Sequence, residues 1–333
     1  MILSICIPTY NRGEKLIESI QNTIQANSDE FEIIIVDNAS PVDIEKSINF
    51  KDDRIRYIKR EKNVGGPYNV GDCLRYGNGI FSMLCLDKDT IIGEDLDDFI
   101  SVLKNNLSIC GGYVVQNKED KERRFDICSE YPILRFGYLN SHPSGQFFRS
   151  DILHDFINGL NESQIADPCV FHIYMAQCAS KGSMMLYDSS LVRLESEEEC
   201  KKIKTHSFKK EDNTLFFAPQ NRIQQFIRYL EHVDTLKITD DYKKMVIEKL
   251  YLDTIIISTI SYANIMRNKT VCEHYGLDTQ DISLTEMRST IKSLKEVFRK
   301  FNYNDELLNS AINKGDQLFK KKYFRYSVKK MFR

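Results

Sequence analysis

The sequence predicts an α/β protein with a mostly parallel sheet, helices on both faces of that sheet, and a helical C-terminal domain. Short apolar runs alternate with stretches of helical periodicity in the first part of the chain, which is the pattern of βαβ units. Polar clusters follow these runs directly, at residues 8–12, 37–41 and 87–89. After Pro219 proline disappears, glycine is rare and helical periodicity dominates.

Four apolar runs of strand length are expected to form strands, at residues 3–7, 31–36, 55–58 and 80–86. A helix that packs on the sheet is expected after the first run, because Leu16, Ile20 and Ile24 recur at helical spacing. A second helix is expected from Pro67, since proline suits the first helical position. The order strand, helix, strand predicts parallel pairing.

The middle of the chain predicts a short strand at residues 146–148, a helix from Asp151, and an apolar helix after Pro168. Residues 183–194 read as a strand pair or as a strand with a turn, and residues 195–213 as a charged loop. Further on, residues 242–266 read as one long helix, and Ser283 with Glu286 forms a capping box before another. We therefore predict two domains, residues 1–212 and residues 213–333.

The composition limits the classes of protein to which this chain can belong. Of the 333 residues, 42% are hydrophobic and 28% charged, as in ordinary globular proteins. The nine cysteines include no C-x-x-C pair, so we expect reduced core thiols in a cytoplasmic protein. A signal peptide is not expected, because the first apolar run is short and enters Pro8 directly. The longest apolar stretch, residues 250–265, is too short and polar to span a bilayer comfortably. Residues 1–210 carry 25 Lys and Arg against 32 Asp and Glu (−7), whereas residues 211–333 carry 21 against 16 (+5).

Two carboxylates follow the apolar run at residues 80–86. Asp87 and Asp89 are one residue apart, so in a strand they would point to the same side. Oxygen ligands with open positions suit Mg²⁺ or Mn²⁺, and a diphosphate would complete the shell. The alternative is a strand that simply ends in a solvated turn. In parallel sheets, ligands bind beyond the carboxyl ends of the strands, which favours the first interpretation.

Two nucleotide-binding classes are disfavoured by the loop after the first strand. A nicotinamide or flavin domain needs G-x-G-x-x-G there, but residues 8–12 read Pro-Thr-Tyr-Asn-Arg. A Walker A loop is also missing from the sequence. A dinucleotide oxidoreductase and a P-loop enzyme are therefore not expected.

Four segments together resemble the family 2 glycosyltransferases of the GT-A fold. They are residues 4–12, 32–40, 63–66 and 86–89, in the same order and spacing as in the family, and the resemblance covers roughly residues 1–210. It implies inverting transfer of a sugar from a nucleotide-sugar, typically a UDP-sugar, with Mn²⁺ or Mg²⁺. Processive members carry a Gln-x-x-Arg-Trp motif and membrane spans. This chain has no Trp, so a single-addition enzyme is expected.

The resemblance also implies roles for single residues. Asp37 would accept a hydrogen bond from the base, Asp87 would lie at the ribose and metal, and Asp89 would ligate the metal. Asp167 falls where the family has its catalytic base, and His206 resembles a position near the diphosphate and metal. The remaining nucleotide-binding residues would be Pro8, Thr9, Tyr10, Arg12, Asn63 and Gly65.

Some positions depart from the family pattern or have a second interpretation. Asn38 and Ala39 stand where the family often has Asp and Gly, and Ala166 replaces an acid that often precedes the base. Asp167 also suits a helix N-cap before Pro168, and Glu162 is the fallback base. His206 also reads as an exposed loop histidine. His142 is assigned to a turn or to the acceptor rim.

The expected partners are a nucleotide-sugar donor and a saccharide or lipid-linked acceptor of surface polysaccharide biosynthesis. Residues 318–333 mix basic and aromatic side chains, which suits an anionic membrane at the inner leaflet or, alternatively, a solvated tail. Nucleic acid is not expected, because the N-terminal part is acidic. The alternatives to a glycosyltransferase are a non-catalytic scaffold that oligomerises through residues 219–333, and another nucleotide-sugar enzyme such as a nucleotidyltransferase.

Overall fold

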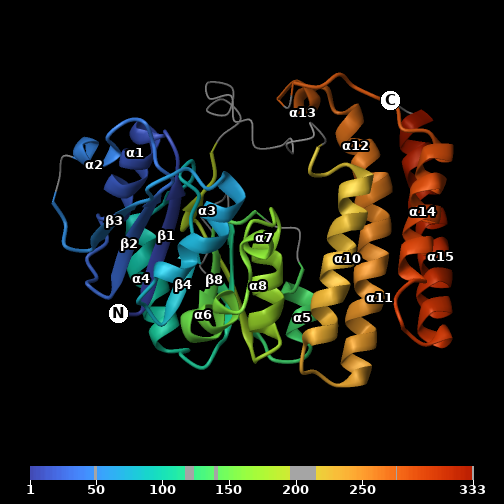
Figure 1. The fold of residues 1–333 in the computed structure, drawn as a ribbon, viewed down its shortest axis with the longest axis horizontal. Coiled ribbons are helices and arrows are strands. Elements are labelled where there is room, and N and C mark those ends of the chain that lie inside the picture. The colour runs from blue at the N-terminus through green and yellow to red at the C-terminus, as the bar shows by residue number, and fades with distance from the viewer. Residues whose placement is uncertain (49–50, 117–123, 139–141, 196–214, 275, 332–333) are drawn as a thin grey trace. The chain divides into compact units, whose positions relative to one another are not determined.

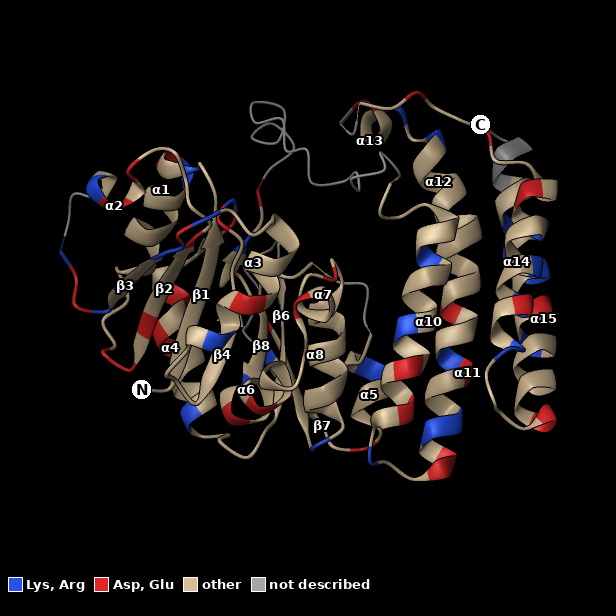
Figure 2. Ribbon diagram, in the orientation of Figure 1, with Lys and Arg blue, Asp and Glu red and all other residues tan. Residues whose placement is uncertain are grey.

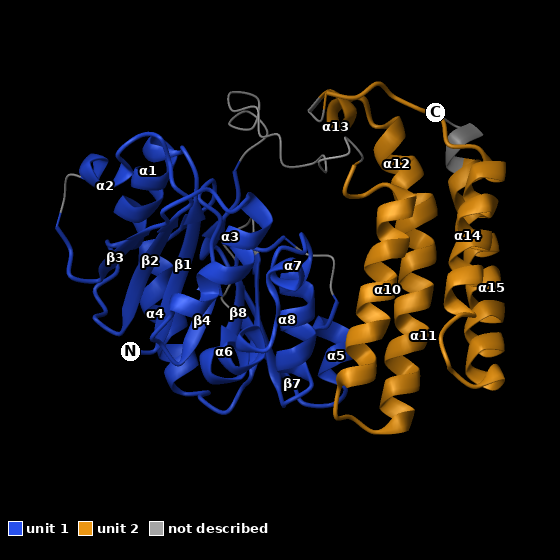
Figure 3. Cartoon of the chain, in the orientation of Figure 1, with its two compact units in different colours: residues 1–196 blue, residues 197–333 orange. Residues whose placement is uncertain are grey.

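We describe the protein from a computed structural model. It describes all residues except 49–50, 117–123, 139–141, 196–214, 275 and 332–333. Two compact units make up the chain: unit 1 is Met1–Ser196 and unit 2 is Glu197–Arg333 (Figure 3). The predicted domain boundary between residues 212 and 213 lies outside the described residues, as does His206.

Unit 1 is built on a mixed sheet with the strand order β3-β2-β1-β4-β8-β6-β9-β7 (Figure 1). The strands β3, β2, β1 and β4 are parallel, whereas β8 is antiparallel to both β4 and β6, and β7 is antiparallel to β9. A small antiparallel pair, β5 with β10, lies outside this sheet. The strands are β1 (Leu3–Thr9), β2 (Phe31–Asp37), β3 (Ile55–Lys59), β4 (Phe81–Leu84), β5 (Thr90–Ile91), β6 (Gly111–Gln116), β7 (Arg124–Cys128), β8 (Gln146–Arg149), β9 (Met184–Ser189) and β10 (Val192–Arg193).

Helices cover both faces of the sheet, as predicted. The two phenylalanines in the middle of β8 show this, because successive side chains of a strand point to opposite faces. The ring of Phe147 lies 5.3 Å from that of Phe99 in α4, and the ring of Phe148 lies 6.2 Å from that of Tyr174 in α8. The helices of unit 1 are α1 (Gly13–Thr23), α2 (Ile44–Ser47), α3 (Gly66–Cys73), the 3-10 turn η1 (Leu74–Tyr76), α4 (Gly93–Lys104), α5 (Pro132–Phe136), α6 (Ser150–Asn158), α7 (Glu162–Ile165) and α8 (Val170–Ala179).

The register of the parallel strands brings their polar ends to one level. Thr9, the last residue of β1, pairs with Asp37, the last residue of β2. On the other side of β1, Cys6 pairs with Leu84 of β4, so the residues after β4 continue beside the end of β1. The next two strands of the chain, β2 and β3, lie on one side of β1, whereas β4 lies on the other side of β1. The edge between β1 and β4 is therefore the point where the strand order reverses, which is where open α/β sheets bind ligands.

Unit 2 is helical, as predicted. Its helices are α10 (Pro219–Thr235), α11 (Asp240–Ile256), the π-helical turn η2 (Ile257–Ser261), α12 (Tyr262–Arg267), α13 (Lys269–His274), α14 (Leu284–Phe298) and α15 (Asp305–Met331). The predicted capping box is present, with Ser283 and Glu286 bonded reciprocally. Where one long helix was expected, η2 interrupts it. The hydroxyls of Thr254, Ser258 and Thr259 each donate to a carbonyl four residues earlier, a bonding pattern that bends helices.

Cysteines and possible membrane spans can be compared directly with the sequence. Among the described residues all cysteines are free, and Cys6, Cys73, Cys85 and Cys178 are buried in unit 1, as expected for core thiols. Burial raises the pKa of the Cys73 and Cys85 thiols well above the usual value, so they stay protonated. No helix in the described ranges combines the length and the apolar character needed to cross a bilayer.

Candidate active site

The ends of β1 and β4 are joined by Thr9, Arg12 and Asp87. The Thr9 hydroxyl donates a 2.9 Å hydrogen bond to Asp87 Oδ2, and Arg12 Nε lies 3.8 Å from Asp87 Oδ1. These three residues come from two strand ends that are 78 positions apart in the sequence. The structure thus brings together three of the residues predicted to bind the donor, and both signs of charge meet at this edge (Figure 2).

Asp87 titrates unusually because of its surroundings. Burial raises its pKa to about 6, and the neighbouring Asp89 carboxylate adds to this, while Arg12 and the Thr9 hydroxyl act in the opposite direction. Burial penalises the charged form of a carboxyl group, so an added cation stabilises the deprotonated Asp87. A raised pKa in a cluster at a ligand-binding edge is typical of functional sites.

Asp89 is completely buried and is held by residues from two other segments. Its Oδ2 accepts a 2.5 Å hydrogen bond from the Ser144 hydroxyl, and its Oδ1 accepts a 3.0 Å bond from the backbone N–H of Glu195. His142 Nδ1 lies 3.6 Å from the same Oδ2. Asp89 is therefore not a solvated turn acid, because the fold orients its carboxylate from both sides.

Ser144 and His142 belong to the loop that enters β8. The Ser144 hydroxyl accepts from the Leu86 N–H at 2.9 Å while it donates to Asp89, and the Ser144 N–H lies 3.3 Å from His142 Nδ1. Burial lowers the pKa of His142, and the Asp89 carboxylate opposes this shift. A neutral imidazole whose Nδ1 accepts this hydrogen bond fits both observations. His142 thus lies beside Asp89, in addition to its predicted place in a turn.

Glu195 completes the cluster. The sequence predicted no role for it, because residues 195–213 read as a charged loop. Its side chain is only 2% exposed, and its Oε1 lies 3.9 Å from Arg12 Nη1. Arg12 therefore lies between two carboxylates, those of Asp87 and Glu195. Nothing in the local sequence pattern distinguishes Glu195 from the three glutamates at 197–199. Its position follows from the pairing of β10 with β5 just before it.

Asp37, predicted to bind the base, is completely buried at the end of β2. Its Oδ1 accepts from the N–H of Ser40 at 2.9 Å and from the Ser40 hydroxyl at 2.5 Å, and its Oδ2 accepts from the Tyr57 hydroxyl at 2.5 Å. Lys59 Nζ lies 4.0 Å from Oδ2. A carboxylate has about four acceptor positions, and three are used here. These bonds leave one of the four acceptor positions of Asp37 unused.

Asn38 connects the end of β2 to the loop before α3. Its Nδ2 donates to Asn63 Oδ1 at 2.9 Å, its Oδ1 accepts from the Val64 N–H at 2.9 Å, and Asn63 Oδ1 also accepts from the Gly65 N–H at 2.8 Å. Gly65 has φ of +86°, a conformation that other residues rarely adopt. The predicted wall residues Asn63 and Gly65 are therefore one hydrogen-bonded loop, and the Asn that departs from the family pattern holds it.

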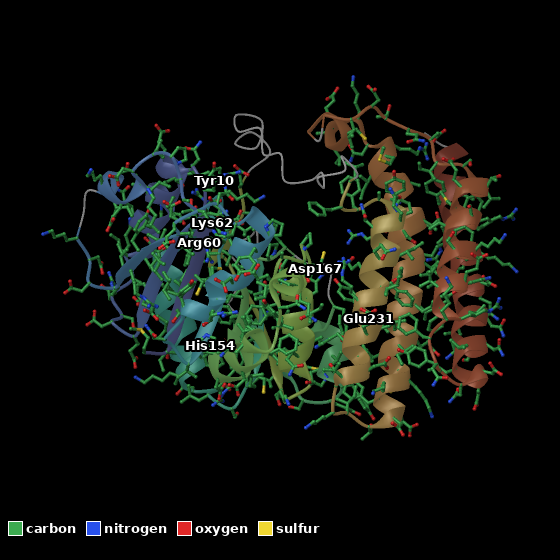
Figure 4. The ribbon with its side chains drawn as sticks, viewed as in Figure 1. Tyr10, Arg60, Lys62, His154, Asp167 and Glu231 are labelled. Atoms are coloured by element: carbon green, nitrogen blue, oxygen red, sulfur yellow. The ribbon has the colours of Figure 1, made fainter. Side chains whose placement is uncertain are left out.

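Pro8 and Tyr10 have different environments although both belong to the first motif. Pro8 is buried inside β1, opposite Val36 of β2. Tyr10 is 47% exposed and lies in the loop above β1 (Figure 4). The next residue, Asn11, adopts φ of +57°, and its N–H donates to the Ser40 hydroxyl at 2.8 Å. Tyr10 is thus the one residue of this motif with a large exposed ring that a ligand can contact.

Asp167 lies between α7 and α8 and is 8% exposed (Figure 4). The predicted N-cap role is wrong, because α8 begins at Val170 with Cys169 as its N-cap and has no side-chain cap bond. The Asp167 Oδ1 instead accepts from the N–H of Cys169 at 2.9 Å, in the turn before the helix. The segment packs closely on α3, because a Cβ on Gly71 would lie 2.5 Å from the Ile165 carbonyl oxygen. Glu162, the fallback base, is exposed in the first turn of α7.

The carboxylate oxygens of the site suit a metal ion that a bound diphosphate also coordinates. Within the described residues, no three His, Cys, Asp or Glu side chains are arranged to hold a metal ion by themselves. Asp87 and Asp89 offer two carboxylates, both withdrawn from bulk water. Mg²⁺ is usually held by one or two carboxylates together with substrate phosphates, so two acids and a diphosphate match its ordinary coordination. His206, the third predicted ligand, lies outside the described residues.

Comparison with known proteins identifies this part of the chain. Residues 4–160 match the family model described as Glycosyl transferase family 2. This part is a family 2 glycosyltransferase domain. All site residues named above except Glu162, Asp167, Glu195 and His206 lie within it.

Two curated relatives of the glycosyltransferase domain have specific names. The abequosyltransferase RfbV of Salmonella typhimurium is 29% identical over 200 residues, which are 58% of this chain and 52% of the relative. The GalNAc(5)-diNAcBac-PP-undecaprenol beta-1,3-glucosyltransferase of Campylobacter jejuni is 26% identical over 157 residues, 44% of this chain and 50% of the relative. The chain thus spans about half the length of these relatives.

Solved structures extend the likeness to the fold. Residues 1–349 of S. aureus TarS align with a TM-score of 0.61 and 15% identity, over 98% of this chain and 92% of that chain. The complex of the same TarS fragment with UDP-GlcNAc aligns with a TM-score of 0.60 and 13% identity. At this level of identity the likeness concerns the fold, and it confirms the GT-A fold that the sequence motifs implied.

Proposed function

We propose that the chain is an inverting, metal-dependent glycosyltransferase that moves one sugar from a nucleotide-sugar to a hydroxyl group of a saccharide or lipid-linked acceptor. The observation that carries this proposal is the cluster of Thr9, Arg12, Asp87 and Asp89 at the edge between β1 and β4, inside the matched family domain. The TarS complexes with UDP and UDP-GlcNAc support UDP as the nucleotide.

Different residues of the site would bind the base, the ribose and the diphosphate of the donor. Asp37, with its remaining acceptor position, would receive the base N–H, and the Asn63–Gly65 loop would flank the base and ribose. Asp87 and Asp89 would hold Mn²⁺ or Mg²⁺ at the diphosphate. When bound, the metal neutralises charge on the leaving nucleoside diphosphate. Arg12, between Asp87 and Glu195, would supply a second positive charge there.

The acceptor hydroxyl must lose a proton as it attacks the sugar. We assign this proton to Asp167, whose Oδ1 accepts from the Cys169 N–H at 2.9 Å and is thereby held in place. The packing of its segment on α3, which follows the Asn63–Gly65 loop, supports a place on the donor side of the domain. One base on the face opposite the leaving group is sufficient for inversion.

The acceptor belongs to a glycan that is assembled before export, in this proposal at the cytoplasmic face of the membrane. One named relative is an abequosyltransferase, and the name of the other includes a polyprenol-linked glycan. Both names support transfer of a sugar during glycan assembly, and the second supports the lipid-linked acceptor expected from the sequence. The shape of the donor pocket decides which sugar is transferred.

The test is donor binding and turnover with purified full-length protein. UDP with Mn²⁺ should raise the melting temperature, EDTA should abolish this rise, and a screen of UDP-sugars should find one that is hydrolysed or transferred. Asp89→Asn should abolish the metal-dependent rise, while Asp155→Asn, an exposed acid of α6, should leave it unchanged. Stabilisation by UDP and Mn²⁺ without turnover of any UDP-sugar would point to the non-catalytic scaffold, and no response to either ligand would reject the proposal.

A further inference from the structure

The second half of α15 has an inner side that anchors it. Phe319 and Tyr326 are each only 7% exposed. The ring of Tyr323 lies 5.7 Å from that of Phe319 and 6.0 Å from that of Tyr326. These residues recur at helical spacing, so one stripe of the helix packs inward. Arg267 stacks over the Tyr326 ring at 5.5 Å, which ties this half of the helix to the end of α12.

The outer side of the same half is basic and carries one large apolar ring. The exposed residues Lys320, Lys321, Lys322, Phe324 and Arg325 form what we call the basic face of α15. Phe324 is 69% exposed, the highest fraction among the large hydrophobic residues of the described chain. Lys320 and Phe324 are four residues apart, as are Lys321 and Arg325, so they lie side by side along the helix.

The charge of this face is not balanced by nearby acids of the chain. Residues 317–333 contain seven Lys and Arg and no Asp or Glu. Within the described residues, none of the four cations of the basic face forms an ion pair, whereas Lys314, six residues before Lys320, pairs with Glu248 at 2.8 Å. Like charges this close repel one another. The face therefore has an electrostatic cost in isolation that an anionic surface would remove.

We propose that the basic face of α15 binds the surface of a membrane that contains anionic lipids. Lys and Arg on a helix together with an exposed Phe are the side chains of an interfacial helix. The Phe324 ring would enter the boundary between headgroups and acyl chains, while the flanking cations contact lipid phosphates. The inference deepens the proposed function, on which its biological meaning rests, because it brings the enzyme to a lipid-linked acceptor.

A membrane explains the observations better than a nucleic acid does. The cations and the ring lie on the exposed side of α15, opposite the buried Phe319 and Tyr326, which suits a flat surface. Binding of nucleic acid by the same face is the competing outcome in the test.

The test is sedimentation of the full-length protein with vesicles. One set contains phosphatidylglycerol and phosphatidylcholine in equal parts, and the other contains phosphatidylcholine alone. Binding should require the anionic lipid and should fall with added salt. Replacing Lys320, Lys321 and Arg325 together by Gln should weaken it about 100-fold, since each cation contributes roughly fivefold. Phe324→Ser should weaken binding about 10-fold and leave its dependence on salt unchanged.

The matched control replaces Lys244, Lys292 and Lys300, three exposed cations elsewhere in unit 2, by Gln, with the same change in net charge. It should bind vesicles as the wild type does. Equal losses in the two triple variants, equal binding to both vesicle types, or tighter binding to an RNA oligonucleotide through the same three residues would overturn the proposal. The vesicle assay needs no donor, so a failure of the proposed function would show separately in the response to UDP and Mn²⁺.

Discussion

Ser144 holds Asp89 through a 2.5 Å hydrogen bond from its hydroxyl, and the same hydroxyl accepts from the Leu86 N–H at 2.9 Å. The two residues are 55 positions apart. They meet because β8 is antiparallel to β4, so the loop that enters β8 lies at the carboxyl end of β4. Ser144 is thus a positioning residue for a carboxylate that is proposed to bind the metal.

Ser144→Ala should weaken the Mn²⁺-dependent binding of UDP about 10-fold. A hydrogen bond to a charged group contributes roughly 1.5–3 kcal/mol, and without it the Asp89 carboxylate can rotate. The measurement is the Mn²⁺ concentration that gives half of the UDP-dependent rise in melting temperature. Ser47→Ala, which alters an exposed hydroxyl in α2, is the control. If both variants need the same Mn²⁺ concentration as the wild type, Ser144 has no positioning role.

Asp167→Asn should lower turnover by about 10²–10⁴-fold, because an amide cannot take the acceptor proton. The Asn oxygen can still accept from the Cys169 N–H, so the start of α8 and the binding of the donor should be preserved. Initial rates with saturating donor, together with the donor Kd, separate the two effects. Glu162→Gln, five residues earlier, is the paired variant. A large loss of turnover in Glu162→Gln alone would transfer the role of base to Glu162.

Donor binding should weaken as the pH falls through about 6. Burial raises the pKa of Asp87 to about 6, so below that pH the carboxyl group is protonated and cannot bind a metal ion. The Mn²⁺-dependent Kd should rise about 10-fold for each pH unit below 6. A UDP-sugar is the appropriate ligand, since both of its phosphates are esterified and do not titrate in this range. A Kd that stays constant from pH 7 to 5 would contradict the raised pKa.

Unit 2 should lose stability in mild acid through His232. This histidine is 7% exposed in α10, and burial lowers its pKa from 6.5 to about 4. The unfolded state therefore binds the proton first, so the stabilisation is complete above pH 6.5 and is lost as the pH falls toward 4. The loss can reach about 3 kcal/mol.

The measurement is the free energy of unfolding in urea, between pH 7.5 and 5, for the wild type and His232→Gln. The variant should show a smaller dependence on pH, whatever its stability at neutral pH. His154→Gln is the control, because that histidine is partly exposed in α6. The same slope in the wild type and in His232→Gln would assign the acid sensitivity to other groups.

Much of the fold was predictable because strands and helices follow from local periodicity. The runs at 3–7, 31–36, 55–58 and 80–86 became β1 to β4, and the capping box at Ser283 marks the start of α14. The break in the helix at 257–261 was not predicted. Hydroxyl side chains that donate back to the backbone alter the helix there, and their geometry is not visible as a pattern of apolar residues.

The site was predictable only in part, for a related reason. Thr9, Arg12 and Asp87 each stand next to an apolar run, so their place at strand ends followed from the sequence. Ser144 and Glu195 carry no such mark. They reach Asp89 from 55 and 106 positions away.

The amino-acid sequence by itself determined the alternation of strands and helices, the position of the acidic pair after β4, and the family to which residues 4–160 belong. Only the tertiary structure decided which side chains hold that pair. The antiparallel insertion of β8 beside β4 brings Ser144 to Asp89, and the pairing of β10 with β5 brings the Glu195 backbone to the same carboxylate. Strand order is a property of the whole chain, because it depends on the burial of all strands together, and short-range patterns do not encode it.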